Sequence, residues 1–416
     1  MKLFLSFMTL FGFLFLTLPG SAAILEVCPA CPIRSIRQAV EQAKEGDTLR
    51  VHTGEYREGT VVIRKPLHLV GIGIPIVDGL KEGNVFWIRA DTVTIEGFVI
   101  QNSGASYIAE FAGIRAEEAK NCTLQNNRFE NNTYSIYLAK VDTCRVEGNK
   151  AHGNALSEVS GGNGVHLWSS KNITIRNNLF ENHRDGIYIE FSGDSLIESN
   201  ISRLNIRYGL HFMYSHRNRY LNNTFSKNQT GVAVMYSRGV EMIGNRFEKS
   251  WGRTSYGLLL KDISDSIVKD NTFYGNTVGL FADEISRITF SGNDFVANGW
   301  AINILGNSET NRFTKNNFVS NYFDVSTNAK SPLNIFEFNY WSDYKGYDLN
   351  RDGQGDIPFR PMGAFSVWIN HYPELVALLA SPIIEFLNVA ERVFPVLTPE
   401  TLEDKTPSMK PILAIK

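Results

Sequence analysis

The chain has 416 residues, 43% of them apolar, so it can bury a large core either in one elongated domain or in two compact ones. Its formal net charge of −2 shows no polybasic signature, which argues against nucleic acid as a partner.

Residues 1–23 are expected to be an export signal. Lys2 gives a positive n-region, residues 3–18 are apolar, and Ser21-Ala22-Ala23 fits a cleavage site. An uncleaved membrane anchor is the alternative, although the apolar run is shorter than the ~20 residues of a spanning helix. We therefore expect an exported protein that is soluble after cleavage.

Residues 24–66 are predicted to form an N-terminal cap region. In an oxidising compartment, Cys28 and Cys31 of its Cys-Pro-Ala-Cys motif could form a disulfide or a soft-metal site. A short helix is expected between residues 33 and 51, because four apolar residues share one helical face: Ile36, Ala39, Val40 and Ala43. Such a helix could cover the open end of a solenoid, whose terminal repeat has no neighbour.

Two landmarks recur within residues 67–338. The first is a glycine followed by alternating apolar residues, at intervals of 22, 23, 22 and 26 residues: Gly164, Gly186, Gly209, Gly231 and Gly257. The second is an Asn-Asn-x-Phe or Gly-Asn-x-Phe turn, whose second asparagine we place at positions 127, 149, 178, 200, 223, 245, 271, 293 and 317. Short alternating strands lie between the landmarks. The pattern predicts an all-β solenoid, a parallel β-helix of about eleven coils in which these asparagines stack as a ladder.

Cys122 and Cys144 are 22 residues apart, one repeat length, so we expect them to stack on adjacent coils. Both align with the core residue Ile173. This alignment favours buried free thiols over a disulfide.

Residues 339–362 are predicted to form an aromatic and Asp-rich junction loop. Oxygen side chains occupy positions 1, 3, 5 and 9 of a calcium-type loop, with glycine at position 6: Asp348, Asn350, Asp352 and Asp356. Phe359 stands where the bidentate glutamate would be, so calcium binding and a purely structural turn are both open. Residues 363–416 are expected to be a C-terminal helical arm, because segments 374–380 and 382–394 have apolar residues at helical spacing. That arm could be a cap or a docking element.

Strand alternation predicts which side chains of the repeat point outward. One outward column contains His166, Tyr188, His211, Ala233 and Leu259, and a second contains Trp168, Glu190, Met213, Met235 and Lys261. Thioether and imidazole ligands suit Cu(I), so the candidate copper ligands are His211, Met213, Met235, His166 and His216. A surface methionine or histidine is more often incidental than a ligand. No histidine or cysteine spacing predicts a closed zinc site.

A carbohydrate enzyme is the competing interpretation, because parallel β-helices house lyases, hydrolases and epimerases that act on acidic sugars. Such a site needs converging acids and bases, for which the candidates are Asp185, Glu190, Arg184 and Arg207. The outward columns carry a single carboxylate, so we predict no catalytic residue and no enzymatic activity.

Four stretches of the repeat resemble the NosD family, the periplasmic accessory proteins of nitrous oxide reductase maturation in denitrification: residues 184–191, 207–215, 231–237 and 256–263. Asn339-Tyr-Trp, Gly346-Tyr-Asp and residues 351–358 continue the likeness. The resemblance implies a right-handed parallel β-helix in the periplasm that delivers copper to the copper–sulfur centre of nitrous oxide reductase. It also implies an ABC transporter partner (an ATPase and a permease that the C-terminal arm meets) and a copper chaperone lipoprotein that hands over the metal. It carries over no ligand residue and gives no role to Cys28 and Cys31.

Overall fold

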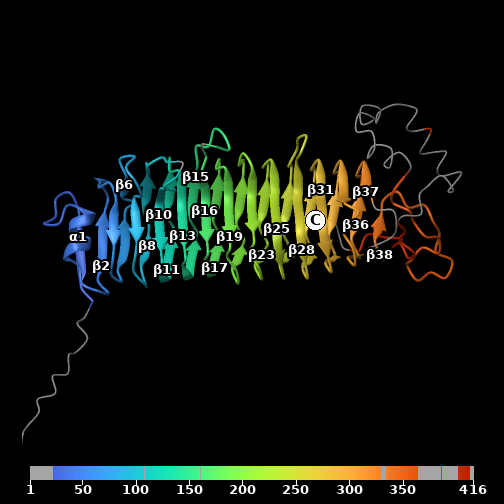
Figure 1. Cartoon of the computed structure of the whole chain (residues 1–416), viewed down its shortest axis with the longest axis horizontal. Helices are drawn as coiled ribbons and strands as arrows, with labels where there is room; N and C mark the ends of the chain where they lie inside the picture. Colours follow the sequence, from blue (N-terminus) through green and yellow to red (C-terminus); the bar gives the residue numbers. More distant parts are fainter. Residues whose placement is uncertain are drawn as a thin grey trace, which may run out of the picture.

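Short strands separated by tight polar corners wind the chain into a rod, with the strands of successive coils side by side along its long axis (Figure 1). This computed structural model describes residues 22–106, 108–159, 161–328, 334–363, 386 and 402–412. Neighbouring strands pair in parallel within three sheets, which confirms the predicted parallel β-helix. Within the described residues, no helix has the length and apolar content needed to cross a membrane.

The first sheet has fourteen strands. They are β1 (Ile24–Val27), β2 (Thr48–His52), β5 (His68–Ile72), β8 (Thr94–Glu96), β11 (Lys120–Gln125), β14 (Asp142–Glu147), β17 (Lys171–Arg176), β20 (Leu196–Glu198), β23 (Arg219–Leu221), β26 (Glu241–Ile243), β29 (Ile267–Lys269), β32 (Thr289–Ser291), β35 (Arg312–Thr314) and β38 (Ile335–Glu337). About fourteen turns therefore replace the predicted eleven, because coils at both ends lack the sequence landmarks.

The second sheet has twelve strands and carries the candidate site. They are β4 (Val61–Ile63), β7 (Phe86–Ile88), β10 (Ala112–Glu117), β13 (Tyr134–Ala139), β16 (Asn163–Trp168), β19 (Asp185–Glu190), β22 (Tyr208–Met213), β25 (Thr230–Arg238), β28 (Tyr256–Ser264), β31 (Val278–Ser286), β34 (Trp300–Ile304) and β37 (Phe323–Thr327).

The third sheet has thirteen strands. They are β3 (Glu55–Arg57), β6 (Ile76–Asp78), β9 (Val99–Gln101), β12 (Arg128–Glu130), β15 (Lys150–His152), β18 (Leu179–Glu181), β21 (Ile201–Arg203), β24 (Thr224–Ser226), β27 (Arg246–Glu248), β30 (Thr272–Tyr274), β33 (Asp294–Val296), β36 (Asn317–Val319) and β39 (Tyr340–Trp341).

The core consists of columns of identical or similar side chains, because each coil repeats the inward positions of the last. The phenylalanine of the turn landmark stacks on its counterpart one coil away, with the rings of Phe273 and Phe295 4.5 Å apart. The glycine landmark marks a close approach of two backbones. A Cβ at Gly209 would lie 2.6 Å from the carbonyl oxygen of Gly231, nearer than real Cβ atoms come.

The predicted asparagine ladder is confirmed. Each side-chain amide donates to the carbonyl oxygen of the next, at 2.9 to 3.3 Å, from Asn127 to Asn339. The predicted rung at Asn317 is wrong: Asn316 occupies the ladder, because it is Asn316 that stands two residues before the buried Phe318. These bonds satisfy buried amides that would otherwise be costly.

The N-terminal cap contains the expected helix, α1 (Ile36–Gln42), which lies at the end of the rod (Figure 1). The Ser35 hydroxyl accepts from the Gln38 N–H and so caps the helix, and the buried face includes Ile36, Ala39 and Val40. However, β1 to β4 of this region already belong to the three sheets. The β-helix thus begins before the predicted boundary at residue 67.

All four cysteines form disulfides, Cys28 with Cys31 and Cys122 with Cys144. The preference for free thiols at Cys122 and Cys144 is therefore wrong. Register pairing places their Cα atoms 4.5 Å apart on the same inward side, which is within the range that a disulfide spans.

Residues 402–412 return to the last coils and contain no helix, unlike the predicted arm. Asp404 forms bridges with Phe336 and Phe359, and Ser408 forms bridges with Tyr340 and with the junction loop. The helices predicted at 374–380 and 382–394 lie outside the described residues, apart from residue 386. The predicted signal is likewise outside them up to residue 21.

Candidate functional site

The two outward columns lie on the second sheet with the predicted register. His166, Tyr188 and His211 are consecutive partners in β16, β19 and β22. Met213 and Met235 are direct partners in β22 and β25. The strand alternation expected from the sequence is therefore confirmed.

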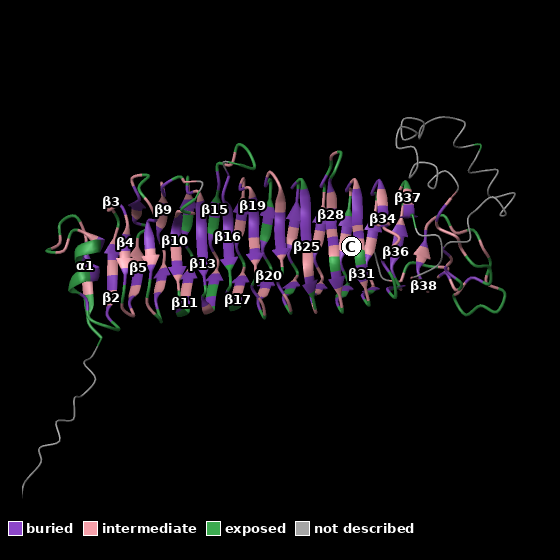
Figure 2. Ribbon diagram, in the orientation of Figure 1, coloured by how far each residue is buried: buried purple, intermediate pink, exposed green. Residues whose placement is uncertain are grey.

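We call the first outward column the histidine column. Its two histidines point outward but are buried, which differs from the exposed face expected from the sequence. His166 is 4% exposed and His211 is 5% exposed. In β13 and β16, residues of both parities are buried, as the purple strands of Figure 2 show. Alternation specifies the direction of a side chain, whereas coverage depends on the size of its neighbours.

Aromatic rings provide that coverage. The rings of Tyr137, His166, Tyr188 and His211 follow one another at centroid separations of 4.6, 4.7 and 4.8 Å. Tyr208 packs 4.6 Å from His211 on its own strand. The intervening Tyr188 ring keeps the two histidines apart, so they do not form one ligand pair.

His211 has both ring nitrogens buried without a hydrogen-bond partner. Burial lowers the pKa of His211 to about 4, against the opposing pull of Asp185. The imidazole is therefore neutral at neutral pH and has a lone pair available to a metal or to a donor. Burial also lowers the pKa of His166 to about 3, and its Nε2 has no partner.

We call the second outward column the methionine column. Its Met213 and Met235 are half-buried and lie directly beside His211. Met213 follows His211 by two residues, so both side chains point to the same side of β22. The Tyr188 hydroxyl donates to Sδ of Met213 at 3.6 Å. Two thioethers and a neutral imidazole thus share one small area of the second sheet.

Three aromatic residues that directly follow residues of this column form a ladder. Phe191 and Tyr214 are exposed, and Tyr236, inside β25, is half-buried. Phe191 stacks on Tyr214 with a centroid separation of 5.4 Å, and Tyr214 stacks on Tyr236 at 4.9 Å. Phe191 is 54% exposed and Tyr214 is 44% exposed. Their φ angles are 49°, 48° and 53°, a left-handed conformation that bulky residues rarely adopt. The equivalent corner residues of the other coils adopt the same conformation, so it belongs to the coil and does not mark these three rings: Glu118, Lys140, Ser169, Asp262 and Glu284.

His216 lies in a surface pocket of about 430 Å³ beyond the aromatic ladder. Its Nδ1 accepts the backbone N–H of Arg238 at 3.3 Å. Phe191, Tyr214 and Arg217 also line this pocket, whereas Met213 does not. The fold thus brings together His211, Met213 and Met235, and it separates His216 and His166 from them.

Two of the candidate enzymatic groups, Asp185 and Arg207, form an ion pair. Asp185 is fully buried and accepts from Nε of Arg207 at 2.8 Å, with a second bond from the same guanidinium. Arg184 adds a longer contact to the carboxylate at 3.6 Å. Burial raises the pKa of Glu190, the carboxylate of the methionine column. Both oxygens of the Asp185 carboxylate are therefore bound by the Arg207 guanidinium.

The calcium-type loop uses its oxygens on its own backbone. Asp348 accepts from the N–H groups of Asp352 and Gly353, and Asp356 accepts from that of Leu349. Asn350 accepts from the Asp352 N–H. Among the described residues, no three His, Cys, Asp or Glu side chains cluster to hold a metal. Calcium binding here stays a prediction.

The sequence placed Tyr188 between the two histidines, but reasoning from it missed the cover that Tyr137 and Tyr208 provide, and it missed the aromatic ladder. A signal for the ladder was present, because Phe191, Tyr214 and Tyr236 recur at 23 and 22 residues, the repeat length itself.

The model of the periplasmic copper-binding protein (NosD) family matches residues 79–160 and 153–348. The chain belongs to the NosD family. A probable ABC transporter binding protein NosD of Stutzerimonas stutzeri is 30% identical over 381 residues, covering 87% of this chain and 86% of the relative. Its namesake in Pseudomonas aeruginosa is 31% identical over 373 residues, covering 85% and 86%. The resemblance read from the sequence is confirmed.

Among solved structures, the catalytic domain of a GH87 α-1,3-glucanase superposes with a TM-score of 0.58 at 12% identity. The match covers 77% of this chain and 69% of the glucanase domain. At this identity the likeness concerns the fold alone, so NosD family membership and not the glucanase guides the functional proposal.

Proposed function

We propose that the protein is a periplasmic copper carrier that works with an ABC transporter to supply Cu(I) for the copper centre of nitrous oxide reductase. One observation carries this proposal: Met213 and Met235 are register partners beside His211, whose two ring nitrogens have no partner. Membership of a copper-binding family and the transporter-binding names of its relatives support it.

The donor set suits Cu(I). Thioether sulfur and neutral imidazole are ligands that this soft ion prefers. Because burial keeps His211 neutral, binding needs no proton to leave the imidazole. Met213 and Met235 are half-buried, so they can meet both the protein interior and an incoming partner. His166 and His216 lie apart from these three and are the weaker candidates.

The Sδ atom of Met213 accepts a hydrogen bond from the hydroxyl of Tyr188. The hydroxyl competes only weakly with copper for this sulfur, because a thioether is a poor hydrogen-bond acceptor. In the metal-free protein it holds the side chain toward the histidine column. We therefore assign Tyr188 a positioning role.

The aromatic ladder is assigned as the contact surface for the protein that delivers copper. Each of its rings directly follows a residue of the methionine column, so a partner resting on the ladder reaches Met213 and Met235. Exposed aromatic rings of this kind are common anchors of protein interfaces. The copper chaperone lipoprotein is the proposed occupant, and the C-terminal arm is proposed to meet the transporter permease.

X-ray absorption at the copper edge tests the ligand set. The anaerobic protein loaded with one Cu(I) is expected to show sulfur and nitrogen scatterers together. Met213→Leu should remove part of the sulfur scattering, and His211→Phe should remove the nitrogen scattering. A spectrum unchanged by either substitution would overturn the assignment. Met242→Leu is the matched control, because Met242 is fully buried inside the rod.

A further inference from the structure

The Cys28–Cys31 disulfide differs from its counterpart in accessibility and in the loop that it closes. Cys122 and Cys144 are 2% and 1% exposed and join two coils across 22 residues. Cys28 and Cys31 are half-buried, and the Pro29 and Ala30 between them are exposed. Closing so short a loop removes little chain entropy. The exposed disulfide is therefore a weak structural staple and an accessible target for a thiol.

The turn that holds the two sulfurs has its own backbone support. The Cys31 N–H donates to the Cys28 carbonyl at 3.1 Å, and the Cys28 N–H donates to the Ile33 carbonyl at 3.2 Å. Val27, just before the turn, forms a parallel bridge with Ile33, just after it. These bonds do not involve sulfur, so the turn can keep its shape after reduction.

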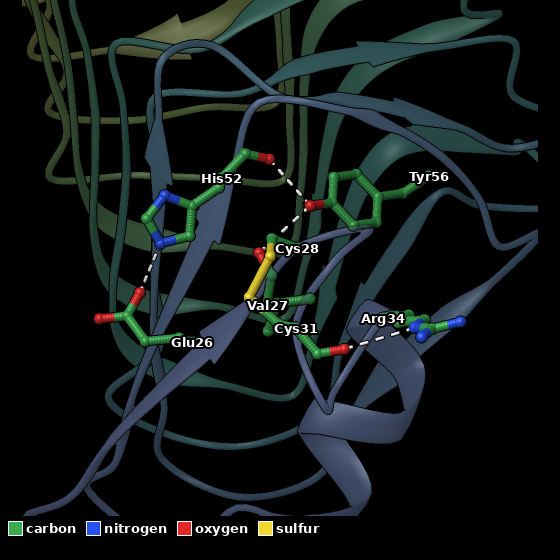
Figure 3. Close-up of a disulfide and its surroundings, with 7 residues drawn as sticks. All are labelled: Glu26, Val27, Cys28, Cys31, Arg34, His52 and Tyr56. Atoms are coloured by element: carbon green, nitrogen blue, oxygen red, sulfur yellow. Dashed lines mark hydrogen bonds and ion pairs between the residues drawn. A yellow bond between two sulfur atoms is a disulfide. The ribbon is translucent and has the colours of Figure 1, made fainter.

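Side chains of the next corner anchor the same turn (Figure 3). The hydroxyl of Tyr56 lies 3.2 Å from the Val27 carbonyl and 2.8 Å from the His52 carbonyl. Pro29 packs so closely on Gly54 that a Cβ there would lie 3.2 Å from the proline ring. The contacts of Val27 with Tyr56 and of Pro29 with Gly54 thus anchor the turn that contains both cysteines.

An arginine that follows the turn binds the backbone of the second cysteine. Nε of Arg34 donates to the Cys31 carbonyl at 3.4 Å, as Figure 3 shows. This bond goes to the peptide carbonyl, so Arg34 supports the backbone of the turn that carries Cys31. The imidazole of His52, also drawn in Figure 3, is bound to Glu26.

From these features we infer that Cys28 and Cys31 form a reducible disulfide whose dithiol form is a second soft-metal site, taking Cu(I). An external dithiol supplies two electrons and two protons. The Cys28–Cys31 bond breaks to give two thiols, and the external dithiol becomes a disulfide. Binding of one Cu(I) then releases the two thiol protons to solvent and forms two copper–thiolate bonds, with no change in the oxidation state of copper.

This second site lies at the end of the rod where α1 lies, while β22 and β25 lie toward the middle (Figure 1). It does not depend on the methionine site proposed above. Reduction would switch the second site on, and oxidation would switch it off.

The first arm of the test counts thiols. The purified exported protein is treated with dithiothreitol without denaturant, freed of it anaerobically, and titrated with a chromogenic thiol reagent. We expect two thiols per chain, because Cys122 and Cys144 are buried. The Cys28→Ser/Cys31→Ser variant should give none. Fewer than one thiol from the wild-type chain, or an undiminished count in the variant, would overturn the proposal.

The second arm titrates the same samples with Cu(I) against a competing chelator. The reduced protein is expected to bind one more Cu(I) than the oxidised protein, and the Cys28→Ser/Cys31→Ser variant should lose this increment. Two thiols with no additional copper would overturn the metal site. The Met213→Leu/Met235→Leu variant should keep the increment, so failure of one site is distinguishable from failure of the other.

Discussion

Asp404 lies at the end of the asparagine ladder and takes the place of its next rung beyond Asn339. One carboxylate oxygen accepts the backbone N–H of Asn339 at 3.1 Å, its side-chain amide at 3.0 Å and the indole N–H of Trp341 at 3.1 Å. A segment 65 residues away in sequence therefore closes the C-terminal end of the rod.

If Asp404 closes the end of the rod, replacing it should destabilise the folded protein. Asp404→Ala leaves the Asn339 backbone N–H and the Trp341 indole N–H without a partner, and the Asn339 amide keeps only its bond to the Phe313 carbonyl. The substitution is expected to lower the free energy of unfolding by about 2–4 kcal/mol. Asp404→Asn keeps an acceptor oxygen and removes a buried charge, whose pKa is raised by burial. Asp404→Asn should therefore lower the free energy of unfolding only slightly, or raise it. Urea unfolding of both variants checks this, and equal losses would contradict it.

The Cys122–Cys144 disulfide between adjacent coils should stabilise the folded protein more than the Cys28–Cys31 disulfide of the N-terminal turn. Cys122→Ala/Cys144→Ala is expected to lower the free energy of unfolding by about 3 kcal/mol, from the entropy of its 22-residue loop. Cys28→Ser/Cys31→Ser, whose cysteines are only three positions apart, should lose less than about 2 kcal/mol. Denaturant unfolding under oxidising conditions compares them. A larger loss from the N-terminal pair would count against our account of that turn.

Acid should destabilise the histidine column. The unfolded chain protonates its histidines near pH 6.5, but burial holds the pKa of His211 at about 4 in the folded protein. Below pH 6.5 the unfolded state thus binds more protons, and stability falls until about pH 4, by about 3 kcal/mol for this residue. His211→Phe should lose less stability than the wild type between pH 7 and pH 4.5 in urea titrations. Equal losses would show that His211 is not the buried neutral group described.

The aromatic ladder should serve transfer more than stability. Tyr214→Asn places a residue that tolerates positive φ at a strained corner, so the free energy of unfolding should change by less than about 1 kcal/mol. Stopped-flow transfer of Cu(I) from the chaperone lipoprotein should slow several-fold, while equilibrium affinity stays the same. A variant with normal transfer, or with a large stability loss, would remove the proposed role of the ladder.

The repeat could be predicted from the sequence because the coil imposes one spacing on all its positions. That spacing gave the parity of His211 and Met213 and the pairing of Met213 with Met235. It could not give the burial of His166 and His211, which depends on tyrosines of neighbouring strands. It brought Cys122 and Cys144 together, but proximity alone does not distinguish two thiols from a disulfide.

The ends of the rod were harder to predict for a different reason. The coils before residue 67 and the segment 402–412 contain neither the glycine nor the asparagine landmark, although they pair with regular coils. The Asn316-Asn317 pair offers two equivalent residues, and only the inward direction of Phe318 selects Asn316. In each case, tertiary pairing decides what the local sequence leaves open.

The most direct test of the copper proposal is an anaerobic Cu(I) titration of the oxidised protein against a competing chelator. The wild type and the Met242→Leu control should bind one Cu(I) with equal affinity. Met213→Leu/Met235→Leu should bind it at least tenfold more weakly, because two soft ligands are lost. Wild-type affinity in that double variant would contradict the assignment of Met213 and Met235 as copper ligands.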